Sequence, residues 1–201
     1  MSSHPGPWLA PRWNSIPPEL QAIPRWVVWR ISRGTKVPFD PKHPNLHASV
    51  TRPETWSTFD EARILVQTRE GEPDAFEGVG LVLNGDGLVG VDLDNCADGG
   101  EPSLAALQLL QELGTGYTEW SPSGKGIRVF GRATPLAKGM RGILGGVSVE
   151  IYSASRYLTV TGQVLRDEPV GPLTGFAALA QRLQQTQSQL HANKSLQPKT
   201  V

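Results

Sequence analysis

Two apolar runs flank a short polar turn at residues 84–87, and they constrain the fold more than any other stretch of the chain. The runs cover residues 78–83 and 88–93, and the turn between them reads Asn-Gly-Asp-Gly. Asn-Gly and Asp-Gly favour the positive φ angles that tight hairpin turns need. We therefore expect residues 78–95 to form a β-hairpin.

Strands are expected over much of the remaining chain. Residues 25–32 are rich in β-branched and aromatic side chains, which is typical of a strand. Residues 33–49 are rich in Pro and Gly and predict a long loop that carries Lys36. Further strands are expected at residues 117–121, 126–131, 147–153 and 157–162.

Helix start and stop signals mark three other segments. Ser57 or Thr58, followed by acidic residues two to four positions later, predicts a helix start, and Gly114 predicts a helix end. Helices are expected within residues 55–70, 102–114 and 175–190. Because helices are mixed with hairpins, we expect an α+β fold with a mostly antiparallel sheet.

The two ends of the chain are expected to lie outside the folded domain. Residues 1–18 are rich in Pro and Ser and predict a flexible arm, in which Trp8 and Trp13 are candidates to dock on the body. Residues 188–201 predict a flexible tail. The domain would then cover residues 19–187.

Composition and charge exclude several classes of protein. Lys plus Arg equal Asp plus Glu, at 19 each, so a nucleic-acid binder would have to use a local basic surface. Cys96 is the single cysteine, which excludes an internal disulfide framework. The N-terminus lacks the pattern of a secretory signal, and no apolar run is long enough to span a bilayer. We expect a soluble, intracellular protein with no membrane partner.

Asp92 and Asp94 stand two residues apart at the end of an apolar run. In a strand they share one face, roughly 7 Å apart along the backbone, while Val91 and Leu93 face a core. Adjacent carboxylates repel each other unless a cation lies between them, and Mg²⁺ prefers such oxygen ligands. The alternative is a strand end with two solvated acids, which would add little to stability.

Two further segments contain candidate site residues. Alternation places Glu150 on the face opposite Val149 and Ile151, so it could join the two aspartates if its strand lies beside theirs. The turn at residues 121–126 contains glycines that let backbone N–H groups approach an anion, and Lys125 adds a charge. It lacks the Walker A pattern, so it is either an ordinary turn or a triphosphate pocket.

Taken in order, three motifs resemble those of the archaeo-eukaryotic primase superfamily, most closely the primase-polymerase domains of phages, plasmids and integrated elements. "VGVDLDN" is similar to a first motif, an apolar strand that ends in D-x-D or D-x-E. "SPSGKGIRVF" is similar to a second, a Ser/Gly-rich turn before a strand with a basic residue. "VEIYSASRYLTVTG" is similar to a third. With the preceding "RWVVWR", "TKVPFDP" and "TWSTFDEA", the resemblance runs from Trp26 to Gly162.

The resemblance implies template-directed nucleotidyl transfer. Asp92, Asp94 and Glu150 would hold two Mg²⁺ or Mn²⁺ ions, one at the attacking 3′-hydroxyl and one at the leaving oxygens. The nucleotide-binding residues that it implies are Ser123, Lys125, Gly126, Arg128, Lys36 and Arg156. It also implies an RRM-like sheet joined to an N-terminal α/β unit, with the active site between them.

One position departs from the family pattern. The second motif commonly has His where this chain has Arg128, which puts a titrating imidazole in doubt. Arginine does not act as an acid or base near neutral pH, but its planar fork binds two phosphate oxygens.

The expected partners are single-stranded DNA template and NTPs or dNTPs. No Walker motif follows the core, so we expect a separate replicative helicase, or a chain that is a fragment. A cytoplasmic location, in bacteria or from a phage or plasmid, fits this interpretation. Two alternatives stay open: a non-catalytic nucleic-acid or nucleotide-binding replication accessory, and a metal-dependent nuclease or phosphohydrolase using the same acids.

Overall fold

Two antiparallel sheets form the framework of the protein, as seen in a computed structural model that describes residues 8–98 and 100–195. Residues 1–7 of the predicted arm and residues 196–201 of the predicted tail lie outside the described residues. The four-stranded sheet has the order β11(Ala154–Val160)-β3(Gly78–Asn84)-β1(Trp26–Ser32)-β2(Thr35–Phe39). The six-stranded sheet has the order β12(Val164–Arg166)-β7(Tyr117–Trp120)-β8(Ile127–Arg132)-β4(Leu88–Asp94)-β10(Val147–Tyr152)-β9(Met140–Leu144).

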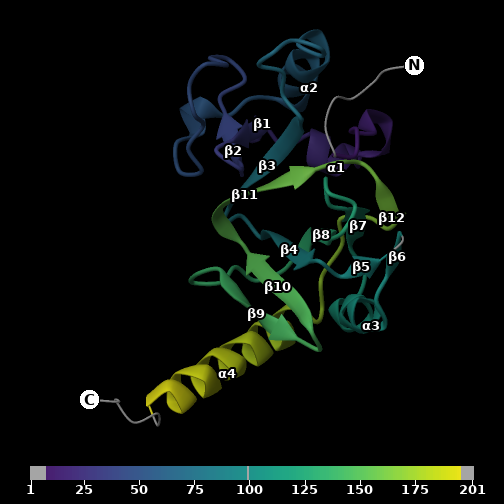
Figure 1. Cartoon of the computed structure of the whole chain (residues 1–201), viewed down its shortest axis with the longest axis vertical. Helices are drawn as coiled ribbons and strands as arrows, with labels where there is room; N and C mark the ends of the chain where they lie inside the picture. The colour runs from purple at the N-terminus through teal and green to yellow at the C-terminus, as the bar shows by residue number, and fades with distance from the viewer. Residues whose placement is uncertain (1–7, 99, 196–201) are drawn as a thin grey trace.

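Within the described residues, four α-helices surround these sheets. They are α1(Pro18–Gln21), α2(Phe59–Thr68), α3(Leu104–Leu113) and α4(Phe176–Ser195). In Figure 1 the four-stranded sheet and α2 form the upper part of the molecule, while the six-stranded sheet, α3 and α4 form the lower part. A small ladder of β5(Ala97–Asp98) and β6(Glu101–Pro102) leads into α3, and 3₁₀ turns lie at Trp13–Ser15 and Pro53–Thr55. The prediction of a mixed α+β fold with antiparallel sheets is confirmed.

The two predicted helix signals act as expected. Thr58 caps α2 in a capping box: its hydroxyl accepts from the N–H of Glu61, whose carboxylate accepts from the N–H of Thr58. Ser103 caps α3 through the N–H of Ala106, and α3 ends before Gly114, whose φ is 91°. Among the described helices, none combines the length and hydropathy needed to cross a bilayer.

The predicted hairpin at residues 78–95 is wrong. β3 pairs with β1 and β11, whereas β4 pairs with β8 and β10 in the other sheet. Both strands are buried at six consecutive positions. Their backbone groups therefore need hydrogen-bonding strands on both edges, and their side chains need packing partners on both faces. The turn at residues 84–87 therefore passes the chain from one sheet to the other. A second crossing, from β10 to β11, lies beside it, and the N–H of Gly85 donates to the carbonyl of Ser153 at 2.9 Å.

The expected loop at residues 33–49 contains a strand, β2, at the edge of the four-stranded sheet. Pro38 lies within it, which an edge strand tolerates because one of its sides needs no ladder bonds. Lys36 is thereby fixed on a strand. The Trp26–Ser32 strand, β1, was predicted and is confirmed.

Two large apolar cores hold the layers together, and a third, small cluster contains Val27, Ala48, Trp56 and Val82. The first lies between the six-stranded sheet and helices α3 and α4. The second covers the four-stranded sheet with α2 and also contains Leu88, Tyr117 and Phe130 of the six-stranded sheet. Because these three residues belong to the other sheet, the second core joins the two sheets to each other.

Candidate active site

Five charged residues lie directly opposite one another on neighbouring strands of the six-stranded sheet. The register pairs Glu119 with Arg128, Arg128 with Asp92, Asp92 with Glu150, and Glu150 with Arg141. Directly opposed residues project from the same face of a sheet. We call these five residues the charged row. Its face is the one predicted for Asp92 and Arg128.

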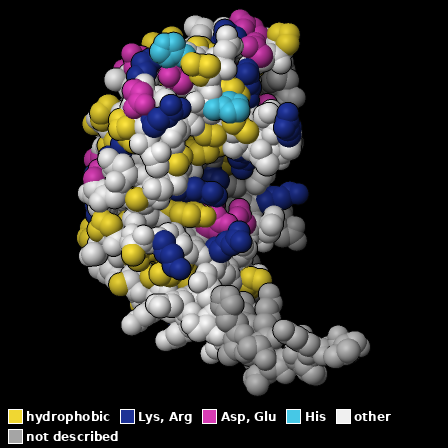
Figure 2. All heavy atoms as spheres, turned by 90° about the vertical axis from the view of Figure 1, so that its left-hand side faces the viewer, with side chains coloured by type: hydrophobic (Ala, Val, Ile, Leu, Met, Phe, Trp, Pro, Cys, Tyr) yellow, Lys and Arg dark blue, Asp and Glu magenta, His cyan; other side chains and the backbone are white. Residues whose placement is uncertain are grey.

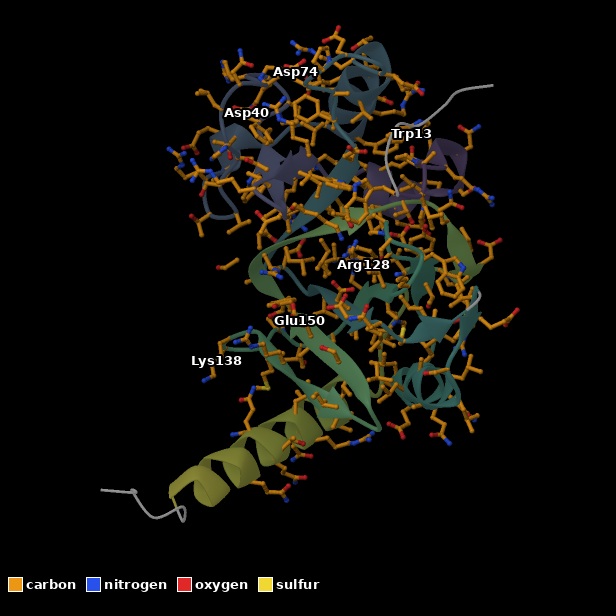
Figure 3. The ribbon with its side chains drawn as sticks, in the orientation of Figure 1. Trp13, Asp40, Asp74, Arg128, Lys138 and Glu150 are labelled. Carbon is orange, nitrogen blue, oxygen red and sulfur yellow. The ribbon has the colours of Figure 1, made fainter. Side chains whose placement is uncertain are left out.

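The other face of the same strands is apolar. Val91, Leu93, Ile127, Val129 and Val149 alternate with the charged residues and are buried in the core against α3 and α4. The charged row therefore faces away from these helices, toward the four-stranded sheet. Figure 3 shows Arg128 and Glu150 at mid-height of the molecule, between its upper and lower parts, and Figure 2 shows basic and acidic side chains gathered at the same height.

Asp92 and Arg128 form a buried ion pair at the centre of the row. Arg128 Nη2 lies 3.2 Å from Asp92 Oδ2, and Nη1 donates to the carbonyl of Thr159 on β11 at 2.9 Å. Arg128 is 5 % exposed and Asp92 is 7 % exposed. Arg128 thus connects the six-stranded sheet to the four-stranded sheet. Asp92 Oδ1 and Arg128 Nε are buried and have no hydrogen-bond partner in the described structure.

Glu150 lies at the more open end of the row. Its Oε2 accepts a hydrogen bond from the hydroxyl of Tyr152 at 2.6 Å and one from Arg156 Nη2 at 3.3 Å. The guanidinium of Arg156 stacks over the Tyr152 ring at 4.7 Å. Burial raises the pKa of Tyr152 to about 12, and its hydrogen bond to Glu150 acts in the same direction. The phenol therefore stays a donor to Glu150 at neutral pH.

Asp94 and Lys36 add charge from two sides. Burial raises the pKa of Asp94, and the negative charge of Asp92 raises it further. Burial also lowers the pKa of Lys36, as does the positive charge of Arg128, while Asp92 and Asp94 oppose the change. Lys36, on β2, therefore brings an ammonium group from the four-stranded sheet to the acids of the six-stranded sheet.

The Ser/Gly turn at residues 121–126 lies beside Asp94, and the N–H groups of its last three residues donate within the turn. The N–H of Gly124 donates to the carbonyl of Ser121 at 2.9 Å, that of Lys125 to Ser123 Oγ at 3.3 Å, and that of Gly126 to Ser121 Oγ at 3.2 Å. These three N–H groups are therefore engaged within the turn, and the triphosphate pocket expected at this turn stays a prediction. The side chains of Ser123 and Lys125 are exposed.

Close packing against the end of β4 explains why residue 126 is a glycine. A Cβ at this residue would lie 2.7 Å from the carbonyl oxygen of Leu93 and 3.5 Å from Cα of Asp94. The carbonyl of Lys125 also accepts from the N–H of Cys96 at 2.9 Å. The turn is thus fastened to the end of β4, which places the Lys125 backbone close to Asp94.

The acids fit a divalent cation, although none of the described residues form a ready-made cluster. No three His, Cys, Asp or Glu side chains among them lie close enough together to hold a metal ion. The buried, unpartnered Oδ1 of Asp92 nonetheless lacks a positive or donor group, and the pKa of Asp94 is raised by burial and by the negative charges of Asp92 and Glu150. Both are relieved by a hard cation with oxygen ligands, such as Mg²⁺ or Mn²⁺.

Sequence reasoning missed Glu119, which is fully buried. Its carboxylate accepts from the N–H groups of Thr161 and Gly162 at 2.9 and 2.8 Å, and from the hydroxyl of Tyr117 at 2.8 Å. Burial raises the pKa of Glu119, and these hydrogen bonds oppose that change. Glu119 thus binds Thr161 and Gly162, the last two residues of the third motif, to β7. The available signal was an acid flanked by apolar and aromatic residues in a strand.

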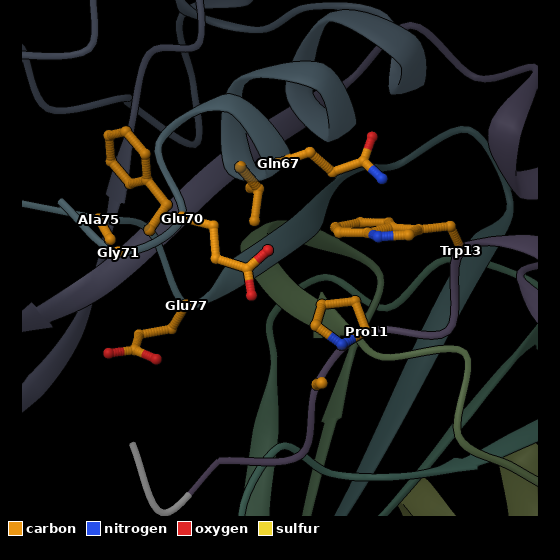
Figure 4. Close-up of a pocket in the computed structure, with 10 residues that line it drawn as sticks. Pro11, Trp13, Gln67, Glu70, Gly71, Ala75 and Glu77 are labelled. Carbon is orange, nitrogen blue, oxygen red and sulfur yellow. The ribbon is translucent and has the colours of Figure 1, made fainter. Parts of the chain in front are cut away.

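A separate cavity of about 230 Å³ lies between the N-terminal segment and the end of α2. Figure 4 shows Pro11, Trp13 and Glu70 on its walls. None of its lining residues belongs to the charged row, so it is not part of the candidate active site.

Comparisons with known proteins identify the family of this chain. The family model described as bifunctional DNA primase/polymerase, N-terminal (Prim-Pol), matches residues 19–182. The chain is also similar to a DNA primase-polymerase of Nitratiruptor phage NrS-1, with 36 % identity over 155 residues. That match covers 73 % of this chain and 21 % of the relative, so the chain spans about a fifth of the length of the phage protein. The chain belongs to the Prim-Pol family, the N-terminal domain of bifunctional DNA primase/polymerases, which are nucleotidyltransferases.

Proposed function

We propose that this chain is a primase-polymerase catalytic domain that carries out template-directed, divalent-metal-dependent nucleotidyl transfer. The observation that supports it best is the charged row, in a chain of the Prim-Pol family. Asp92 lies between Arg128 and Glu150 on neighbouring strands, and Lys36 of the other sheet interacts with Asp92 and Arg128. The two-sheet arrangement also fits an RRM-like sheet joined to an N-terminal α/β unit, as in archaeo-eukaryotic primases.

The three acids would serve as ligands of the metal ions. Asp92, through its unpartnered Oδ1, would hold Mg²⁺ or Mn²⁺ together with Asp94 and Glu150. When bound, a pair of such ions lowers the pKa of the attacking hydroxyl and neutralises charge on the leaving oxygens. Tyr152 and Arg156 hold Glu150 in place through Oε2.

Arg128 is assigned to positioning. Both of its terminal nitrogens are bound to protein oxygens, so it fixes the Asp92 carboxylate and ties it to β11. Its permanent positive charge also compensates the charge of the Asp92 carboxylate between the sheets. The proton-transfer role of a histidine at this place has no counterpart in this chain, because arginine stays protonated.

The substrate phosphates are assigned to the exposed or half-buried cations around the row. Lys36, Lys125 and Arg156 lie around the acids, and Ser123 stands beside Lys125 in the turn. Charge-assisted contacts to phosphate are stronger than neutral hydrogen bonds. The proposed substrates are NTPs or dNTPs on a single-stranded DNA template, with a separate helicase to expose it.

A second candidate is a non-catalytic binding module of the same family. It is favoured by the Asp92–Arg128 ion pair, which occupies one oxygen of the principal acid. A metal-dependent nuclease is the third candidate, because the same acids would suit it.

A single assay separates the three. The protein is incubated with unprimed single-stranded DNA, labelled nucleotides and Mg²⁺ or Mn²⁺, with an EDTA control. A primase-polymerase gives labelled oligomers that EDTA abolishes. A binding module gives a complex with no product, and a nuclease shortens the DNA; either result contradicts the proposal.

A further inference from the structure

The described part of the N-terminal arm runs across the boundary between the two sheets. The N–H of Leu9 donates to the carbonyl of Pro122, in the Ser/Gly turn, at 2.7 Å. The ring of the preceding residue, Trp8, packs edge-on against Trp29 of the four-stranded sheet, with centroids 5.9 Å apart and an interplanar angle of 85°. Two consecutive arm residues therefore contact site segments of different sheets.

The ammonium of Lys36 lies beside both indoles. Its Nζ is 5.0 Å from the centroid of Trp8 and 5.8 Å from that of Trp29. Both distances are within the range of a cation–π interaction, which strengthens as the ammonium loses water. Burial does remove water from this ammonium, as the lowered pKa of Lys36 indicates. Trp29 is 1 % exposed, so it is a fixed wall, whereas Trp8 comes from the arm.

The Lys36 side chain needs a packing partner because it lies at the edge of its sheet. It projects from β2, the outermost strand of its sheet, on a flexible stem that has many rotamers in water. Asp92 and Asp94 attract it toward the row, while Arg128 repels it. Without Trp8, one side of the ammonium would be open to solvent.

We propose that Trp8 is a positioning residue of the nucleotide site, which holds the Lys36 ammonium against Trp29 so that it meets the phosphates of the incoming nucleotide. The inference rests on the proposed function and adds the N-terminal arm to the substrate site. It gives the arm a role in binding the nucleoside triphosphate, in addition to its packing.

The test is a double-mutant cycle on Trp8 and Lys36. The dissociation constant for dATP with Mg²⁺ is measured by calorimetry in the absence of DNA for the wild type, Trp8→Leu, Trp8→Phe, Lys36→Met and the double variant Trp8→Leu/Lys36→Met. Trp8→Leu should weaken binding about two- to thirty-fold, the range for loss of one cation–π contact. Trp8→Phe keeps an aromatic face and should stay within about twofold of the wild type. In the Lys36→Met background, Trp8→Leu should add no further loss.

A matched control comes from the same arm. Trp13 packs on Phe59, with centroids 6.4 Å apart, and is not in contact with Lys36. Trp13→Leu should leave dATP affinity unchanged. Thermal unfolding of every variant shows whether the fold is kept, and Trp8→Phe provides a reading even if Trp8→Leu proves unstable.

The inference is overturned by any of four results. These are unchanged affinity in Trp8→Leu, equal losses in Trp8→Leu and Trp8→Phe, an undiminished Trp8→Leu effect in the Lys36→Met background, and an equal loss in Trp13→Leu. A wild-type protein that binds no dATP overturns the proposed function and this inference together. Wild-type binding without coupling between Trp8 and Lys36 overturns this inference alone.

Discussion

Asp92 and Asp94 look equivalent in the sequence but differ in their surroundings. Asp92 is buried and paired with Arg128, whereas Asp94 is half-buried and has a raised pKa caused by burial and by the charge of Asp92. The alternative of two solvated acids therefore does not hold for Asp92, which is buried. Its ion pair sits in the region between the sheets, where an uncompensated charge is costly.

The substitutions Asp92→Asn and Asp94→Asn should have the same effect on activity and different effects on stability. Each should lower nucleotide incorporation by more than about a hundred-fold, because losing a metal ligand exceeds the usual loss at outer-shell residues. Asp92→Asn should also lower the free energy of unfolding by up to about 3–5 kcal/mol, since it leaves Arg128 without its charge partner. Asp94→Asn should be at least as stable as the wild type at pH 7, because a raised pKa means that the fold disfavours the ionised form. Urea unfolding and a primer-extension assay measure the two effects; near-normal incorporation by either variant contradicts the metal assignment.

Arg128→Ala provides a second prediction for single residues. It should lower the free energy of unfolding by about 3–5 kcal/mol, because Asp92 becomes an unpaired buried charge. Arg132→Ala, at an exposed position of the same strand, should change it by less than about 0.5 kcal/mol. If Arg128→Ala unfolds like the wild type and yet binds dATP more weakly, Arg128 contacts phosphate directly, as its sequence motif predicted.

Among the elements, two of the three crossings between the sheets determine where the site forms. The β3–β4 crossing sends Asp92 into the six-stranded sheet, and the β10–β11 crossing returns the chain after Glu150 to the four-stranded sheet. Asp86 fixes the first crossing: it accepts from Arg25 Nη1 at 2.8 Å and from the N–H of Leu88 at 3.1 Å. Arg25 also donates to the carbonyl of Val82.

This crossing should make stability depend on pH in the acid range. Although burial opposes it, the hydrogen bonds from Arg25 and Leu88 lower the pKa of Asp86 below its ordinary value of 3.8. A lowered carboxylate pKa stabilises the fold above pH 3.8, and the stabilisation is lost as the pH falls through the folded-state value. Wild type should therefore exceed Asp86→Asn in unfolding free energy at pH 7, and the difference should shrink below about pH 4.

Urea unfolding of both proteins between pH 7 and pH 3 measures this difference. Asp60→Asn serves as the control, because Asp60 forms an exposed ion pair with Arg63 on α2 and surface pairs contribute little. A difference between wild type and Asp86→Asn that is constant across this range contradicts the assignment.

At the scale of the whole molecule, the shared core makes the two sheets one unit. Leu158 of β11 packs where a Cβ at Gly90 of β4 would lie, so a four-stranded-sheet side chain fills space in the six-stranded sheet. We expect a single cooperative unfolding transition, in which tryptophan fluorescence and far-UV circular dichroism coincide.

Leu158→Ala should shift both signals together and lower the free energy of unfolding by about 2–5 kcal/mol, the cost of a large-to-small change in a core. Ile64→Ala, at a half-exposed position of α2, is the matched control and should cost less. Two separate transitions, or a shift of one signal only, would show that the sheets unfold independently.

The sequence by itself determined the local parts of the structure. The helix start at Thr58 follows from a side-chain oxygen that bonds the N–H of Glu61 three residues away, and α3 ends at Gly114, which adopts a positive φ. Alternation along β4, β8 and β10 placed Asp92, Arg128 and Glu150 opposite the apolar core, because successive side chains of a strand point to opposite faces. The three motifs together also identified the family.

Only the tertiary structure decided which strands meet. The turn at residues 84–87 has hairpin residues, yet burying both faces of β3 and β4 requires partners from β1, β8, β10 and β11, which no local pattern specifies. The same pairing puts Arg128 against Asp92, hides Glu119, and brings Lys36 and Trp8 to the site from residues far along the chain. Side-chain periodicity is local, whereas strand pairing depends on burial summed over the whole chain, and the chemistry of this site depends on that pairing.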